Sequence, residues 1–158
     1  MKMISWKDYA VGIFLVEAVG GLASWLTRTG REAYKLMVTK PPLTPPDILF
    51  PIVWAILYAL MGIGAVRIWY ADISRARMWG LIIFAVQLGL NFIWNFVFFQ
   101  FQVFGLAFLL LLVLLVLIVL MIYFFSKVDL TAAKLQIPYL LWVGFATYLT
   151  GMVWYLNI

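Results

Sequence analysis

Five long apolar runs dominate the sequence, and each is long enough to cross a lipid bilayer as an α-helix, which takes about 20 residues. They span about residues 6–26, 48–70, 78–101, 103–125 and 135–156. Hydrophobic residues make up 67% of the chain and charged residues only 11%, which is too little polar surface to cover a water-soluble domain. The apolar runs lack strict alternation, which favours helices over strands. We therefore expect an all-α integral membrane protein, a single bundle of five transmembrane helices that forms one domain over residues 1–158.

The residue types that the chain lacks exclude several kinds of chemistry. It has no cysteine and no histidine, which excludes a thiolate nucleophile, a Ser-His-Asp triad, a histidine-anchored zinc site and the usual axial ligands of haem. We expect no metal site and no resident cofactor. The net charge of +5 comes from cations in short segments between the apolar runs. Such cations set membrane orientation and meet anionic lipid, so we expect the bilayer and no nucleic acid as a partner.

The connection between the first two runs, about residues 27–47, is the longest. Four prolines lie between residues 41 and 46, and they exclude helix and force extended backbone there. A structureless loop of this length in a compact protein is usually functional, often as a lid. A merely solvated linker is the alternative, and we favour the lid.

The distribution of lysine and arginine predicts the orientation. The N-terminus and the segments after the second and fourth runs carry seven of these cations, and the opposite side carries four, all in the long loop. This bias favours a cytoplasmic N-terminus and an external loop. We expect a multi-pass protein of the cell membrane.

The third run carries polar side chains at helical spacing on one face: Gln87, Asn91, Trp94, Asn95 and Phe98. An unmet amide in lipid costs several kcal/mol, so this face points to the interior of the bundle. Spacing alone leaves two interpretations open. The amides either form interhelical hydrogen bonds, each worth about 0.6–2 kcal/mol, or line a cavity that suits a large flat ligand.

Three tryptophans lie deeper in the runs than the aromatic belts at membrane interfaces explain: Trp54, Trp94 and Trp142. Trp54 shares a helix face with Tyr58, and Trp142 shares one with Ala146. Bulky interior packing is the alternative. Together with the amide face, the deep tryptophans favour a ligand pocket.

Other features of the runs are less specific. Glu17 lies near the middle of the first run, where a carboxylate is costly and is a functional candidate by default. Ala85 and Gly89 form a small-xxx-small pair that suits either an internal helix contact or a homodimer. The fourth run is almost purely aliphatic and aromatic, so we expect it to face lipid or a partner subunit.

Three segments form motifs in a specific order. The first is Lys40-Pro-Pro-Leu-Thr-Pro-Pro-Asp47 with Phe50-Pro-Ile-Val-Trp-Ala-Ile-Leu-Tyr-Ala-Leu-Met-Gly62. The second is Leu90-Asn-Phe-Ile-Trp-Asn-Phe-Val-Phe-Phe99, and the third is Leu141-Trp-Val-Gly-Phe-Ala-Thr-Tyr-Leu149. Together they resemble the TspO/MBR family, which comprises tryptophan-rich sensory proteins and the translocator protein, or peripheral benzodiazepine receptor. The resemblance covers the whole chain, and the absence of histidine and cysteine makes it look like a bacterial member.

The resemblance implies a five-helix bundle, often dimeric, with a pocket that the first loop closes. The family binds porphyrins such as protoporphyrin IX and drug-like isoquinoline and benzodiazepine ligands, and some members bind cholesterol. Its pocket residues carry over by motif to Trp54, Asn91, Trp142 and Ala146, with Tyr34 reaching in from the loop. To these we add Tyr58 and Trp94 as ligand-binding residues.

The resemblance also implies an activity. Bacterial members promote light-dependent oxidative breakdown of protoporphyrin IX, and they require pocket tryptophans, which assigns the catalytic role to Trp54 and Trp142. We expect the loop cations to attract the porphyrin propionates. The alternative is a transporter or sensor of porphyrins or other hydrophobic ligands such as sterols, without chemistry. The cholesterol motif of mammalian members lacks its cation here, because none follows Tyr148.

Overall fold

The computed structural model describes residues 2–158, and all regular structure in this range is helical. The helices are α1 (Trp6–Leu26), α2 (Arg28–Met37), α3 (Leu49–Trp69), α4 (Arg75–Asn95), the π-helical turn η1 (Phe96–Gln100), α5 (Phe104–Ser126), α6 (Leu130–Lys134) and α7 (Ile137–Leu156). Within the described range, five helical segments are long and apolar enough to cross a membrane. The predicted fold class is confirmed.

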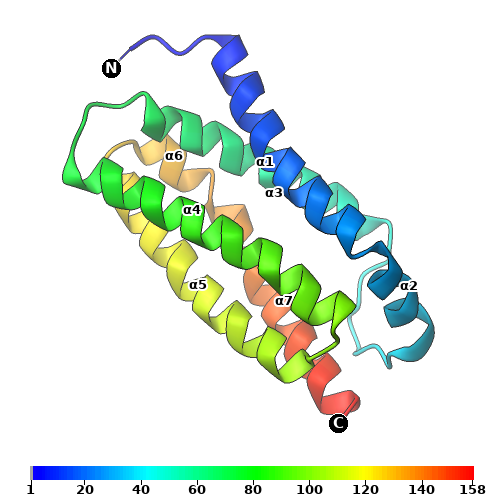
Figure 1. Cartoon of the computed structure of the whole chain (residues 1–158). Helices are drawn as coiled ribbons and strands as arrows, with labels where there is room; N and C mark the ends of the chain where they lie inside the picture. Colours follow the sequence, from blue (N-terminus) through cyan, green and yellow to red (C-terminus); the bar gives the residue numbers. More distant parts are fainter. Residues whose placement is uncertain (1) are drawn as a thin grey trace.

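The long helices run side by side as one bundle (Figure 1). Helix α1 packs against α3 and α4, α4 packs against α5, and α5 packs against α7. The short helix α6 contacts both α5 and α3, while α2 contacts η1. Helix α2 and the C-terminus lie at the same end of the bundle, and the N-terminus lies at the other (Figure 1).

The first connection differs from the expected structureless loop, because its first half is helix α2. The prolines begin only at residue 41, so the segment before them is free to form a helix. Within the first connection, turns and irregular backbone are confined to residues 38–48. Helix α2 lies very close to η1: a Cβ atom on Gly30 would lie 2.4 Å from the carbonyl oxygen of Phe99. Glycine at this position therefore permits the contact that holds α2 over the bundle.

Helix α5 was expected to face lipid or a partner, and the structure corrects this in part. One face of the helix is exposed, but its other face forms much of the hydrophobic core. The buried residues repeat every three or four positions, as one face of a helix requires: Ala107, Leu111, Leu114, Ile118, Met121 and Phe125. A uniformly apolar helix gives no contrast between faces, so the pattern alone did not identify the core side.

A polar junction fixes the end of the bundle opposite α2. The Arg67 guanidinium lies 2.9 Å from the Asp129 carboxylate and donates to the Tyr9 hydroxyl at 3.2 Å. Burial raises the pKa of Asp129, but the backbone N–H of Ala132 and the Arg67 guanidinium outweigh it and hold this pKa below its ordinary value. The junction joins α3 to α1 and to the start of α6.

The contact between α1 and α3 depends on close backbone approach. A Cβ atom on Gly62 would lie 2.8 Å from both the carbonyl oxygen of Gly12 and the Cα atom of Ile13. Both obstacles are backbone atoms, which cannot rotate away as a side chain can. The small residue therefore sets the spacing of these two helices.

We predict that Gly62→Ala destabilises the bundle by about 1–3 kcal/mol through overpacking. Gly144→Ala is the matched control, because a Cβ atom there has no neighbouring atom within 4 Å. Thermal unfolding of both variants in lipid nanodiscs tests this. Equal midpoints for Gly62→Ala and the unmodified protein would show that α1 and α3 are not packed this closely.

Candidate functional site

A chain of buried hydrogen bonds crosses the interior of the bundle. The Tyr58 hydroxyl donates to Oδ1 of Asn91 at 3.3 Å, and Nδ2 of Asn91 donates to the Tyr139 hydroxyl oxygen at 2.9 Å. Tyr139 in turn donates to Oε1 of Gln87 at 2.6 Å, and Nε2 of Gln87 contacts the sulfur of Met61 at 3.7 Å. All five side chains are buried. These four contacts each join two different helices among α3, α4 and α7.

These hydrogen bonds bear on the two interpretations of the polar face of α4, which carries the amides of Gln87, Asn91 and Asn95. Gln87 and Asn91 do point to the interior, and each forms an interhelical hydrogen bond. Asn95 is half-buried, and its amide donates to the backbone carbonyl of Asn91 at 3.0 Å. The interhelical bonds are therefore present, and a direct role of Asn91 in ligand binding stays a prediction.

Aromatic rings surround this polar chain. Trp54 lies on the two tyrosines, with ring centroids 5.3 Å from Tyr58 and 6.2 Å from Tyr139. One turn away on α7, the ring of Trp142 packs edge-on against Phe50 at 5.8 Å. We call these five residues the tryptophan cluster. It brings together three of the predicted site residues: Trp54, Tyr58 and Trp142.

An open groove lies between α3 and α7 beside this cluster. It is shallow and open to the outside, with a volume of about 400 Å³. Its walls are almost entirely apolar, and Trp142 is the tryptophan that lines it. The lining residues are Val53, Ile56, Leu57, Pro138, Leu141, Trp142 and Phe145.

A second aromatic cluster lies under α2. Tyr34 packs against Phe98 at 5.2 Å, Phe99 at 5.5 Å and Phe104 at 6.5 Å, and the Trp94 ring stacks on Phe98 at 4.9 Å. We call these five residues the Tyr34 cluster. The π-helical turn η1 supplies two consecutive phenylalanines to it. Burial, together with the nearby Asp47 carboxylate, raises the pKa of Tyr34 to about 12, so the phenol is neutral at physiological pH.

The predicted site residues therefore fall into two neighbouring groups. Tyr34 and Trp94 belong to the Tyr34 cluster, while Asn91 lies one turn before Trp94 on α4 and bonds to Tyr139 of the tryptophan cluster. Asn91 thus connects the two groups. Ala146 is half-buried, one turn beyond Trp142 on α7, and packs against the core.

Two buried indole groups lack a hydrogen-bond partner. Within residues 2–158, no acceptor lies in reach of the buried Nε1 atoms of Trp94 and Trp142. Trp94 is only 8% exposed. Buried donors are normally satisfied, so each exception needs a physical explanation. Both indoles can donate to an acceptor on a molecule that enters the site.

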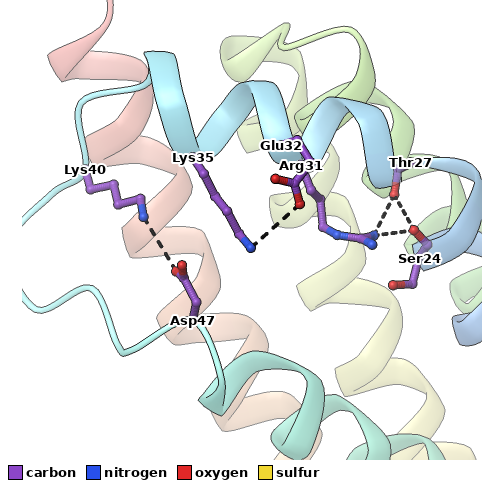
Figure 2. A network of polar contacts seen from close by, with 7 residues as sticks. All are labelled: Ser24, Thr27, Arg31, Glu32, Lys35, Lys40 and Asp47. Carbon is purple, nitrogen blue, oxygen red and sulfur yellow. Dashed lines mark hydrogen bonds and ion pairs between the residues drawn. The ribbon is translucent and has the colours of Figure 1, made fainter.

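We call helix α2 and the loop that follows it, residues 28–48, the lid-like segment, although its role as a lid stays a prediction. It carries four cations, of which Figure 2 shows Arg31, Lys35 and Lys40. Arg31 donates to the backbone carbonyl of Ser24 and, at 3.2 Å, to the Thr27 hydroxyl, which ties α2 to the end of α1. Lys35 lies 3.9 Å from Glu32. Such ion pairs between exposed side chains stabilise a protein by at most about 1 kcal/mol, so the lysine remains available to an anionic ligand.

The remaining cations of this segment are placed similarly. Lys40 lies 3.5 Å from Asp47, across the proline-rich loop (Figure 2). Arg28 lies over the ring of Trp25, with 4.5 Å between its guanidinium carbon and the ring centroid. These contacts also leave the positive charge near the surface of the segment.

Two residues that contact the predicted site residues in the structure, Tyr139 and Phe50, were not among the site residues predicted from the sequence. Tyr139 is the centre of the hydrogen-bond chain, and its spacing of three residues from Trp142 on one helix face was the available signal. Phe50, which contacts Trp142, had a similar signal, because it lies four residues before Trp54 on one face of α3.

Glu17 lies close enough to Tyr58 of the tryptophan cluster to act on its hydroxyl electrostatically. It is half-buried on α1, and no hydrogen bond or ion pair to it is present within the described residues. Its functional role stays a prediction.

These features define a class of protein: a multi-pass helical membrane protein with two interior aromatic clusters, an apolar groove and a cationic segment at one end.

The sequence profile of the TspO/MBR family matches residues 12–156. The tryptophan-rich protein TspO of Chlorobaculum tepidum is 39% identical over 94% of each chain. TspO of Archaeoglobus fulgidus is 35% identical over 92% of this chain and 94% of its own. The translocator protein of Ovis aries is 33% identical over 92% and 88%. The chain belongs to the TspO/MBR family.

We predict that Tyr139→Phe destabilises the protein by about 1–3 kcal/mol, because it leaves the Asn91 donor and the Gln87 acceptor buried without partners. Tyr123→Phe is the control: Tyr123 is exposed on α5, and the change should alter stability by less than about 0.5 kcal/mol. Unfolding in nanodiscs, followed by tryptophan fluorescence, measures both. The hydrogen-bond chain would lose its central role if the two variants were equally stable.

Proposed function

We propose that the chain binds a tetrapyrrole such as protoporphyrin IX between the tryptophan cluster and the Tyr34 cluster, and that it promotes light-dependent oxidative breakdown of this ligand. The observation that carries the proposal is the pair of unpartnered indole N–H groups of Trp94 and Trp142. Trp94 stacks on Phe98 and Trp142 packs edge-on against Phe50, and such aromatic surroundings suit a flat conjugated molecule. Isoquinoline- and benzodiazepine-type ligands are also flat, carry acceptor atoms and suit the same site.

The cations near the site support an anionic ligand. Arg28, Arg31, Lys35 and Lys40 all belong to the lid-like segment, and protoporphyrin IX carries two propionate groups. Ion pairs with these groups place the charged edge of the porphyrin at the membrane surface and its apolar ring in the bundle. This arrangement avoids the cost of burying a carboxylate in lipid.

The breakdown needs light, dioxygen and an electron-rich side chain. Light excites the porphyrin, dioxygen is the terminal oxidant, and a tryptophan held against the ring exchanges an electron with the excited state. Trp54 and Trp142 have this role in our proposal, with Trp54 closely packed on Tyr58. Because the ligand itself absorbs the light, the chemistry requires no resident cofactor.

A carrier or sensor without chemistry is the second candidate. The apolar lining of the groove between α3 and α7 favours it, because such a surface suits any hydrophobic ligand, sterols included. We further propose that the protein lies in the cell membrane with its N-terminus in the cytoplasm, as the distribution of cations favours. A homodimer is compatible with the exposed Ala85 and Gly89 on α4.

We predict that Trp54→Phe and Trp142→Phe each slow the light-dependent loss of protoporphyrin IX at least about tenfold at saturating ligand, while saturable binding persists. Trp6→Phe and Trp154→Phe are the controls, because both residues are exposed near helix ends. Absorbance of the porphyrin band in the dark and under illumination measures binding and breakdown separately.

The outcomes distinguish the two candidates. Saturable binding with an unaltered porphyrin under light would favour the carrier or sensor. Breakdown at the normal rate in both cluster variants would eliminate the role of the tryptophans. A lack of saturable binding would contradict the proposed site itself.

A further inference from the structure

The loop after α2 is held to the last turn of α7 by one side chain. Asn157 accepts a hydrogen bond from the backbone N–H of Thr39 at 2.9 Å and donates to the backbone carbonyl of the same residue at 2.9 Å. Its amide also donates to the carbonyl of Val153 at 2.8 Å, which fixes the amide orientation. A weaker tether lies nearby, where the Tyr148 hydroxyl donates to the carbonyl of Pro42 at 3.1 Å.

The pair formed by Asn157 and Thr39 reproduces the bonding between two strands of a sheet. A primary amide presents one acceptor and one donor side by side, and these match the N–H and C=O of a single backbone residue. Aspartate keeps the acceptor but loses the donor, and leucine keeps only the shape. Asparagine is therefore specifically suited to this position.

The loop has few other ways to hold its position. Prolines at positions 41, 42, 45 and 46 have no N–H groups, so residues 41–46 keep only the backbone donors of Leu43 and Thr44, too few for a ladder of hydrogen bonds. Tethers from side chains of α7 replace such a ladder. Because Thr39 is exposed, water can take over both bonds, and the tether opens more easily than the buried core.

The two ends of the loop lead to the two aromatic clusters. Before the loop, Tyr34 of α2 packs against Phe98 at 5.2 Å. After the loop, Phe50 in the first turn of α3 packs against Trp142 at 5.8 Å. Movement of the loop away from α7 therefore loosens contacts at both clusters together.

We propose that Asn157 is a latch: a positioning residue that keeps the loop closed over the end of the bundle and sets how fast a ligand enters and leaves the site. Asn157 does this through Thr39, without contact with the ligand. The inference rests on the proposed function for its ligand, but the closed loop itself is testable without any ligand. Loss of the latch raises the population of the open state, so association and dissociation both become faster.

We predict that Asn157→Leu makes amide hydrogen exchange in residues 38–48 of the ligand-free protein about tenfold faster, as expected for the loss of two modest hydrogen bonds. Asn157→Asp, which keeps the acceptor, should give an intermediate rate. Ser126→Ala is the matched control, because it removes one exposed bond from a side chain to a backbone carbonyl at the far end of α5. Exchange is measured by mass spectrometry in nanodiscs.

The same variants are then loaded with protoporphyrin IX in the dark, and its dissociation is followed by fluorescence during a chase with empty vesicles. The latch predicts dissociation about tenfold faster in Asn157→Leu, together with faster association, so that affinity changes less than either rate. A merely structural role would instead weaken affinity without accelerating association.

Each outcome separates the latch from the proposed function. Unchanged exchange in Asn157→Leu overturns the latch, whether or not a porphyrin binds. Faster exchange without any saturable porphyrin binding supports the latch and contradicts the proposed ligand. Faster exchange with unchanged ligand kinetics overturns the gating role of Asn157.

Discussion

The bilayer offers no hydrogen-bond partner to a polar group at membrane depth, and one hydrogen-bond chain supplies such partners within the protein for four buried side chains. Tyr58, Asn91, Tyr139 and Gln87 bond to one another across α3, α4 and α7. These bonds fix how the three helices face one another. The position of Trp54, which packs on two of the four residues, follows from them.

The proposed site is marked by two buried donors that the hydrogen-bond chain does not include. Its own amides and hydroxyls are bonded to one another, whereas the indole N–H groups of Trp94 and Trp142 have no acceptor within residues 2–158. The bonded groups support the ring of Trp54, and in the proposed function the two free indole donors meet the ligand. This division between supporting and recognising groups is the arrangement that a precise binding site needs.

The sequence predicted the five membrane helices well, because hydropathy is a property of each segment by itself and does not depend on how segments pack. It also predicted that Gln87 and Asn91 face the interior, because lipid leaves amides no alternative. Helix α2 and the π-helical turn η1 were not predicted, since both depend on the close contact of α2 with the end of the bundle.

Other residues could not be predicted for the same reason. The partner of Asn157 is Thr39, which is 118 residues away in the chain, and no local pattern connects them. Tyr139 became central only once α7 was placed against α4. The functional roles of Trp54 and Trp142 remain predictions, because they depend on a ligand rather than on the fold.

The most direct test of this account is a two-dimensional NMR spectrum of the indole N–H groups, recorded in nanodiscs with and without protoporphyrin IX in the dark. The chain has eight tryptophans, and single Trp→Phe variants assign the resonances. The account predicts ligand-induced shifts of Trp54, Trp94 and Trp142, with the downfield movement of a newly formed hydrogen bond at the last two. Five exposed tryptophans serve as internal controls: Trp6, Trp25, Trp69, Trp79 and Trp154. Shifts confined to these five, or none at all at saturating porphyrin, would contradict the account.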